Sequence, residues 1–131
     1  MNELWDRIIE NYKIARECLV YSKKKDCWIR QEDKGMYHLW IAYYTALNAE
    51  EKNHLFYARV LSLMGWEMQA KSSNYELLNK YYKPAVEQYT LAMEENPNCV
   101  YPKEIENVRK SYEYYKYIVE KSKIRTDSDY Y

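Results

Sequence analysis

Residues 73–97, SNYELLNKYYKPAVEQYTLAMEENP, decide the fold that the sequence predicts. Ser73 and Glu76 have the spacing of a capping box, in which the serine hydroxyl accepts a hydrogen bond from a free N–H of the first helical turn, so a helix should begin at Ser73. Pro84 lies inside the helical pattern that follows. Because proline disrupts a helix interior, it either kinks this helix or opens a new one. The pattern resumes to Glu95 and stops before an Asn-Pro-Asn sequence.

The residues before this stretch are also expected to be helical, because residues that break helices are scarce. Only two glycines and three prolines occur in 131 residues, which favours long helices over strands and turns. A first helix is expected from Asn2, a good N-cap, to the lysine run at residues 23–25, since cations suit a helix C-terminus. Its apolar residues recur every three or four positions and form one stripe: Leu4, Trp5, Ile8, Ile9, Tyr12, Ala15, Cys18 and Leu19.

A second helical stretch is expected from about Gly35 to Met64. The polar residues 48–53 leave open whether the helix passes through this region or breaks there. Gly65 suits the position just after a helix C-terminus. The expected buried side carries Tyr37, Trp40, Tyr44, Leu47, Leu55, Ala58 and either Leu61 or Ser62.

The last helix is expected to start near Pro102 and to fray after Lys123. Its apolar positions are Ile105, Val108, Tyr112, Tyr115, Ile118 and Val119. Together these patterns predict an all-α protein, either an antiparallel helical bundle or stacked helical hairpins, with four to five helices. We expect a single domain over residues 1–124 and a disordered tail over residues 125–131.

One segment resembles a known family. The spacing Tyr82-x-x-Ala85-x-x-x-Tyr89-x-x-Ala92-x-x-x-x-Pro97 is similar to the second helix of a tetratricopeptide repeat. The resemblance implies that the two alanines let a neighbouring helix approach closely while Tyr89 fills the groove. It covers residues 82–97 only, because the positions where the family has tryptophan, leucine, glycine and tyrosine are Gln69, Ser72, Ser73 and Glu76. The other interpretation is an ordinary amphipathic helix that ends at a proline.

Bulk composition argues against several classes of protein. The chain has 20 basic and 20 acidic residues, whereas dedicated nucleic-acid-binding or membrane-surface proteins usually carry a basic excess. No apolar stretch approaches the roughly 20 residues of a membrane span. The three cysteines, Cys18, Cys27 and Cys99, are odd in number and widely spaced, which is typical of free thiols in a reducing cytoplasm. We therefore expect a soluble, cytoplasmic protein.

The sequence contains no convincing catalytic, metal or cofactor motif. Glu51 and His54 have the spacing of half a di-iron site, but such sites need a second Glu-x-x-His motif and two further glutamates. The only other histidine, His38, has Gly35 in the glutamate position. Zinc quartets and phosphate-binding glycine loops are also missing from the sequence. We therefore predict a protein that is not an enzyme and binds no cofactor or metal.

The aromatic content is the most distinctive feature of this chain, which has 17 tyrosines, four tryptophans and one phenylalanine. A core of this size is not expected to satisfy many buried hydroxyl groups, so several tyrosines should lie at the surface. Tyrosine and tryptophan are enriched where proteins contact partners. Charge is also uneven, because residues 109–125 carry six basic and two acidic side chains, whereas residues 84–108 carry five acidic and one basic.

These features predict a small protein–protein interaction module, such as an adaptor, an assembly subunit or an inhibitor, that binds another protein through a tyrosine-rich helical surface. An alternative is a subunit that contacts nucleic acid through the basic last helix, with lysines on phosphates and tyrosines on bases. A third possibility is a homodimer in which tyrosine faces pair. The candidate contact residues are Tyr112, Tyr114, Tyr117, Lys110, Lys116, Lys121, Tyr81, Tyr82 and Tyr89.

Overall fold

The computed structural model describes residues 3–20 and 31–129, and the side chains as far as Lys123. Within these ranges it contains five helices and no strand, which confirms the all-α class. The fourth helix is continuous but has three segments, of which the middle one, η2, is π-helical. The bounds are α1 Glu3–Leu19, α2 Glu32–Asn48, α3 His54–Glu67, α4 Asn74–Glu76, η2 Leu77–Tyr82, α5 Lys83–Glu95 and α6 Pro102–Asp129.

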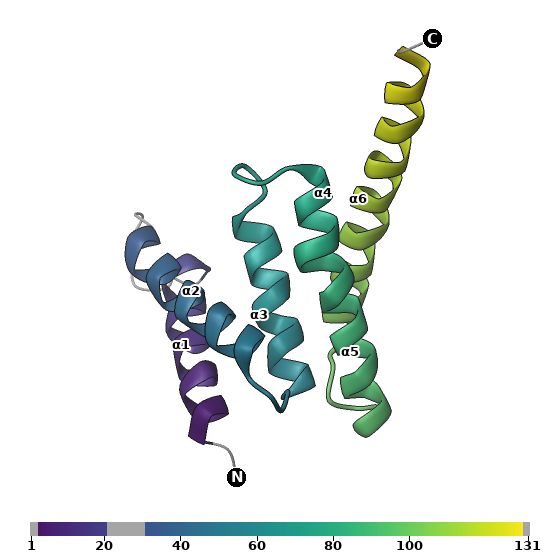
Figure 1. The fold of residues 1–131 in the computed structure, drawn as a ribbon. Helices are drawn as coiled ribbons and strands as arrows, with labels where there is room; N and C mark the ends of the chain where they lie inside the picture. The colour runs from purple at the N-terminus through teal and green to yellow at the C-terminus, as the bar shows by residue number, and fades with distance from the viewer. Residues whose placement is uncertain (1–2, 21–30, 130–131) are drawn as a thin grey trace.

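The helices stack in the order in which they occur along the chain (Figure 1). α1 packs on α2, α2 on α3, α3 on η2 and α5, and α6 on the far side of η2 and α5. The α1–α2 pair and α6 therefore lie at opposite sides of the molecule, with α3 between them (Figure 1). None of the described helices has the length and apolar character that crossing a bilayer requires.

The buried face of α2 differs from the one that the sequence predicted. Tyr37, Tyr44 and Leu47 are exposed, whereas the face that packs inward carries Gly35, Leu39, Ala42, Tyr43 and Ala46. Small side chains dominate this inner face because α1 approaches closely. A Cβ atom added to Gly35 would lie only 2.6 Å from Cγ of Leu19. Close packing against α1 therefore selects the stripe of small residues instead of the neighbouring stripe of bulky aromatics.

The polar segment at residues 48–53 separates two helices, which settles the alternative that the sequence left open. Asn53 is the N-cap of α3, and its side chain accepts a hydrogen bond from the Phe56 N–H at 3.2 Å. The Lys52 ammonium group lies within 2.6–3.0 Å of three carbonyl oxygens at the end of α2, those of residues 46, 47 and 49. Trp5 on α1 donates to the Glu51 carbonyl at 2.7 Å, so this turn is also tied to α1.

Gly65 does not terminate a helix, so that prediction was wrong. α3 continues to Glu67, and Gly65 is buried inside it. A Cβ atom at this position would lie 2.8 Å from the ring of Tyr82. The glycine is needed because a tyrosine ring from the fourth helix packs directly on the α3 backbone.

The fourth helix begins as predicted, with the Ser73 hydroxyl accepting from the Glu76 N–H at 3.1 Å. Pro84 lies in the first turn of the α5 segment, which follows η2 without a break. Its ring would clash with the carbonyl oxygen four residues earlier in a regular α-helix. The π-helical segment places a wider turn just before Pro84, and the Lys83 N–H bonds to the Leu78 carbonyl, five residues back.

α6 starts at Pro102, as predicted, and buries Val108 and Tyr115 against the rest of the molecule. It runs to Asp129, so the expected end near Lys123 was too early. Its final turns project beyond the other helices (Figure 1). The disordered tail expected over residues 125–131 stays a prediction. The Asn2 cap and the lysine run at residues 23–25 lie outside the described residues, as does Cys27, whereas Cys18 and Cys99 are free thiols.

Candidate functional site

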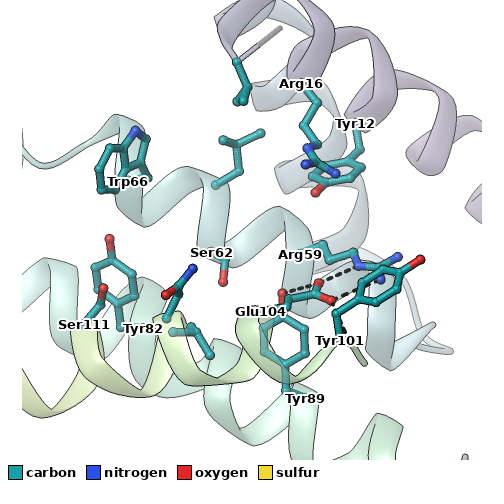
Figure 2. Close-up of a pocket in the computed structure, with 14 residues that line it drawn as sticks. Tyr12, Arg16, Arg59, Ser62, Trp66, Tyr82, Tyr89, Tyr101, Glu104 and Ser111 are labelled. Carbon is teal, nitrogen blue, oxygen red and sulfur yellow. Dashed lines mark hydrogen bonds and ion pairs between the residues drawn. The ribbon is translucent and has the colours of Figure 1, made fainter. Parts of the chain in front are cut away.

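A groove of about 800 Å³ opens between α1 and α6, with α3 as its floor. Side chains from η2 and α5 close its inner side (Figure 2). The lining combines aromatic rings with a small number of polar and charged groups. It consists of Tyr12, Arg16, Val20, Arg59, Ser62, Leu63, Trp66, Tyr82, Tyr89, Tyr101, Glu104, Asn107, Val108 and Ser111.

Three helices each present one stripe to this groove. Successive lining residues of one helix are three or four positions apart, apart from two adjacent pairs, so each set lies on a single helix face. The stripes are Tyr12 and Arg16 on α1, with Val20 just after it; Arg59, Ser62, Leu63 and Trp66 on α3; and Glu104, Asn107, Val108 and Ser111 on α6, with Tyr101 just before it.

A charged cluster anchors one end of the groove (Figure 2). The Arg59 guanidinium donates from Nε to one oxygen of Glu104 at 2.6 Å and from Nη2 to the other at 3.2 Å. The Tyr89 hydroxyl donates to Glu104 at 2.8 Å, and the Tyr101 N–H donates at 3.4 Å. The carboxylate thus joins α3, α5 and the first turn of α6.

The electrostatics of this cluster follow from its hydrogen bonds. Burial by itself raises the pKa of Glu104, but the bonds from Arg59 and Tyr89 favour the charged form more strongly, so the pKa lies below its ordinary value of 4.5. Burial also raises the pKa of Tyr89, and the adjacent carboxylate adds to that rise. At neutral pH the cluster therefore holds an ionised Glu104, a charged Arg59 and a neutral Tyr89.

The rest of the groove is largely aromatic. Trp66 and Tyr101 stand at opposite ends and are 63% and 71% exposed. Tyr82 is buried, stacks on Tyr115 with ring centres 5.4 Å apart, and accepts a hydrogen bond from Gln69 at 3.4 Å. The Ser62 hydroxyl lies between Trp66 and Tyr101 (Figure 2). In the described part of the chain it is the one buried side-chain oxygen or nitrogen without a hydrogen-bond partner.

The groove is lined by aromatic, hydroxyl, amide and charged side chains. In the described ranges no group of three His, Cys, Asp or Glu side chains is placed to hold a metal ion. Glu51 and His54 do not share a helix face, because Glu51 lies in the turn before α3. His54 instead lies 2.6 Å from the side-chain oxygen of Gln88 and 3.5 Å from Glu95. The groove offers aromatic surface with charged and hydroxyl groups at fixed positions, as binding sites do.

Three of the predicted contact residues are buried. Tyr81, Tyr82 and Tyr89 are each at most 3% exposed, so they do not form an exposed contact surface, although Tyr82 and Tyr89 line the inner side of the groove. Several tyrosines do lie at the surface, as expected, but the core also holds seven. Several hydroxyls find partners at the edge of the core, as in Tyr82 and Tyr89. The seven are Tyr12, Tyr43, Tyr57, Tyr81, Tyr82, Tyr89 and Tyr115.

The remaining candidates lie on α6 but divide between two faces. Lys110, Tyr114, Tyr117 and Lys121 are all exposed and share one face, which we call the outer face of α6. The 100° turn per residue places this face about 120° around the helix from the stripe that lines the groove. Lys116 points elsewhere and lies 5.8 Å over the ring of Tyr112, which is half-buried.

Sequence reasoning missed the groove itself. Its members come from helices that are distant along the chain, so no local motif records it. One signal was available, because Arg59 is the only Asp, Glu, Lys or Arg among residues 54–66, which form most of α3. A charge inside an apolar helix needs a partner, and this partner is Glu104.

Comparison with known proteins adds no relative to this picture. No protein-family model, no curated protein and no solved structure matches the chain.

Proposed function

We propose that this protein is a non-enzymatic protein–protein interaction module, and that it binds a helical segment of another protein in the groove between α1 and α6. The observation that carries the proposal is the groove, whose two walls and floor are helices with one stripe each. We place this activity in the cytoplasm, in keeping with the free thiols of Cys18 and Cys99.

The dimensions of the groove favour a helix as the ligand. Its lining runs along α6 from Tyr101 to Ser111, which corresponds to about 15 Å at 1.5 Å per residue, or roughly three turns. An amphipathic helix of this length presents anchors at positions i, i+3 or i+4, and i+7. The same spacing occurs on the walls, so the ligand would take the place of a further helix packed against α1, α3 and α6.

The lining also indicates the composition of the ligand. The rings of Trp66 and Tyr101, which are 63% and 71% exposed, provide large rigid contact area, as in interaction hot spots. The proposed ligand therefore carries apolar or aromatic anchors.

Affinity purification from the native host tests this proposal. The groove variant combines Trp66→Ala and Tyr101→Ala, and the matched control combines Tyr114→Ala and Tyr117→Ala on the outer face of α6. Both pairs are at least half exposed, so both variants should fold. A partner that co-purifies with wild type and the control, but is lost or reduced at least tenfold with the groove variant, supports the proposal. Equal retention by the groove variant contradicts it.

A second candidate function is contact with nucleic acid through the outer face of α6. The observation that favours it is that Lys110, Tyr114, Tyr117 and Lys121 share one exposed face, with the Lys121 ammonium 5.2 Å from the Tyr117 ring centre. Lysines could neutralise phosphates while tyrosines stack on bases. A gel shift with short single strands at low salt should disappear in a Lys110→Glu, Lys121→Glu variant. Absence of any shift for the wild type removes this candidate.

A further inference from the structure

α2 has an unusual composition for a surface helix. Residues 35–49 contain no Asp, Glu, Lys or Arg, although 31% of the whole chain consists of these four residues. The single histidine in this segment is His38. Its Nδ1 atom lies within hydrogen-bond distance of Oδ1 of Asn11 in α1, at 2.7 Å. Depletion of charge, together with enrichment of tryptophan and tyrosine, distinguishes the centres of protein interfaces from ordinary surface.

Both sides of α2 are apolar, but the outer side is largely exposed. The inner side packs on α1. The outer side carries Tyr37, Trp40, Tyr44 and Leu47, which we call the α2 stripe, and of these only Trp40 is half-buried against the core. Tyr37, Tyr44 and Leu47 are 44–64% exposed, and the rings of Trp40 and Tyr44 stack with centres 5.3 Å apart. A helix that is apolar all round is normally buried, so the α2 stripe has the composition of a face that an assembly covers.

We propose that the α2 stripe is covered by the α2 stripe of a second copy of this chain, in an antiparallel pair around a two-fold axis that crosses the outer side of α2 at the level of Ala42. The positions of the residues are symmetric about Ala42. Tyr37 and Leu47 are equally far from it along the helix, as are Trp40 and Tyr44. Antiparallel pairing therefore places Tyr37 opposite Leu47 and Trp40 opposite Tyr44, twice each. Such self-complementarity is the requirement for a closed two-fold interface.

Charge also favours a second copy over a charged partner. The α2 stripe brings no like charges together, and the net charge of zero removes long-range repulsion between copies. The ends of α2 carry both signs of charge, with Glu32, Asp33 and Lys34 at one end and Glu50, Glu51 and Lys52 beyond the other, so antiparallel pairing also brings opposite charges towards each other. The α2 stripe itself is uncharged, so the proposed dimer does not depend on an attraction that salt screens. An association of the basic outer face of α6 with an acidic surface would weaken as salt is added.

Sedimentation equilibrium of the purified full chain tests the proposal. The mass of wild type should rise with concentration from one towards two chains of 16.1 kDa, and the rise should not move to higher concentration in high salt. Tyr44→Glu, which places two carboxylates beside the axis, should remain monomeric. The matched control Tyr114→Glu replaces a tyrosine of similar exposure on α6 and should behave as wild type.

Each alternative outcome overturns the proposal. A wild type that stays monomeric up to its solubility limit shows that the copies do not pair. Dimerisation that persists in Tyr44→Glu, or that is lost in Tyr114→Glu, places the contact elsewhere. Circular dichroism establishes that Tyr44→Glu is folded, and Leu47→Lys, at a position 44% exposed, repeats the test if it is not. Because no residue of α2 lines the groove, these outcomes do not depend on whether the groove binds a partner.

Discussion

Glu104 joins three elements of the structure. Its carboxylate receives hydrogen bonds from α3, from α5 and from the N-terminal turn of its own helix. Side-chain exposure is 16% for Arg59 and 20% for Glu104, so solvent screens the pair only partly. A carboxylate near the start of a helix also interacts favourably with the helix dipole. Loss of this charge should therefore loosen the attachment of α6 to α3.

Substitution of Glu104 by Gln should lower the free energy of unfolding by about 2 kcal/mol at neutral pH, because hydrogen bonds to a charged group and one buried charge are disrupted. The control Glu106→Gln removes an exposed pair with Lys110 and should cost less than about 0.5 kcal/mol. Urea unfolding followed by circular dichroism measures both changes. Equal losses for the two variants would contradict this role of Glu104.

The effect of Glu104→Gln on the free energy of unfolding should depend on pH. The pKa of Glu104 is lower in the folded chain than its ordinary value of 4.5. Its stabilising contribution is therefore complete above about pH 4.5 and is lost as the pH falls through the lower folded value. The difference in stability between wild type and Glu104→Gln should be constant near neutral pH and shrink below about pH 4.5. A difference that stays constant down to about pH 3 would show that the charge of Glu104 is not responsible.

Gly65 is a second residue whose role depends on one contact. Alanine there should raise helix propensity by up to about 1 kcal/mol, but its Cβ would meet the Tyr82 ring at 2.8 Å. Overpacking a core costs about 1–3 kcal/mol, so Gly65→Ala should be destabilising overall, by about 1 kcal/mol. In a Tyr82→Leu background the same change should become neutral or stabilising. An equal loss in both backgrounds, measured by thermal unfolding, would mean that Tyr82 is not the obstacle.

At the scale of elements, the turn between α2 and α3 depends on Lys52. Lys52→Met should lower stability by about 1–2 kcal/mol, because its ammonium group binds three carbonyls at the end of α2 and also interacts with the helix dipole. The control Lys13→Met removes an exposed lysine from the middle of α1 and should change stability by less than about 0.5 kcal/mol. Chemical denaturation distinguishes the two. A Lys52→Met variant as stable as the control would show that the turn does not need this cap.

The sequence could predict those helix boundaries that local chemistry determines. Ser73, Pro97 and Pro102 act through their own backbone and side chains, and α5 and α6 end and begin where these residues indicate. Gly65 could not be interpreted in this way, because the reason for a glycine there is a ring from another helix. Pro84 is an intermediate case. Its effect on the helix is local, but the π-helical segment that precedes it was not predicted.

The orientation of α2 needed tertiary information. Its sequence contains two adjacent stripes with helical spacing, one of small residues and one of large aromatics, and hydrophobicity alone favours the aromatics. The structure packs the small residues on α1 because close approach of two backbones requires them. The aromatic stripe that the sequence marked for burial is therefore left exposed, and this conflict is the basis of the proposed self-association.

At the scale of the whole molecule, the helical stack creates a site that no single element contains. The three stripes that line the groove become neighbours only because α1 and α6 are held apart on opposite sides of α3. The sequence predicted the class of fold from caps and periodicity, but the groove depends on how helices distant in sequence are placed. The prediction of a tyrosine-rich contact surface is retained as a proposal, with its location moved from Tyr81 and the α6 lysines to the groove, which Tyr82 and Tyr89 help to line.

Hydrogen exchange of the protein alone and in complex with its captured partner tests the central claim most directly, because it locates the contact along the chain. We predict added protection in the segments that line the groove, residues 12–20 of α1, 59–66 of α3 and 101–111 of α6. No added protection is expected at residues 114–121 of α6. Protection confined to the outer face of α6 or to α2, with exchange in the groove segments unchanged, would contradict the account.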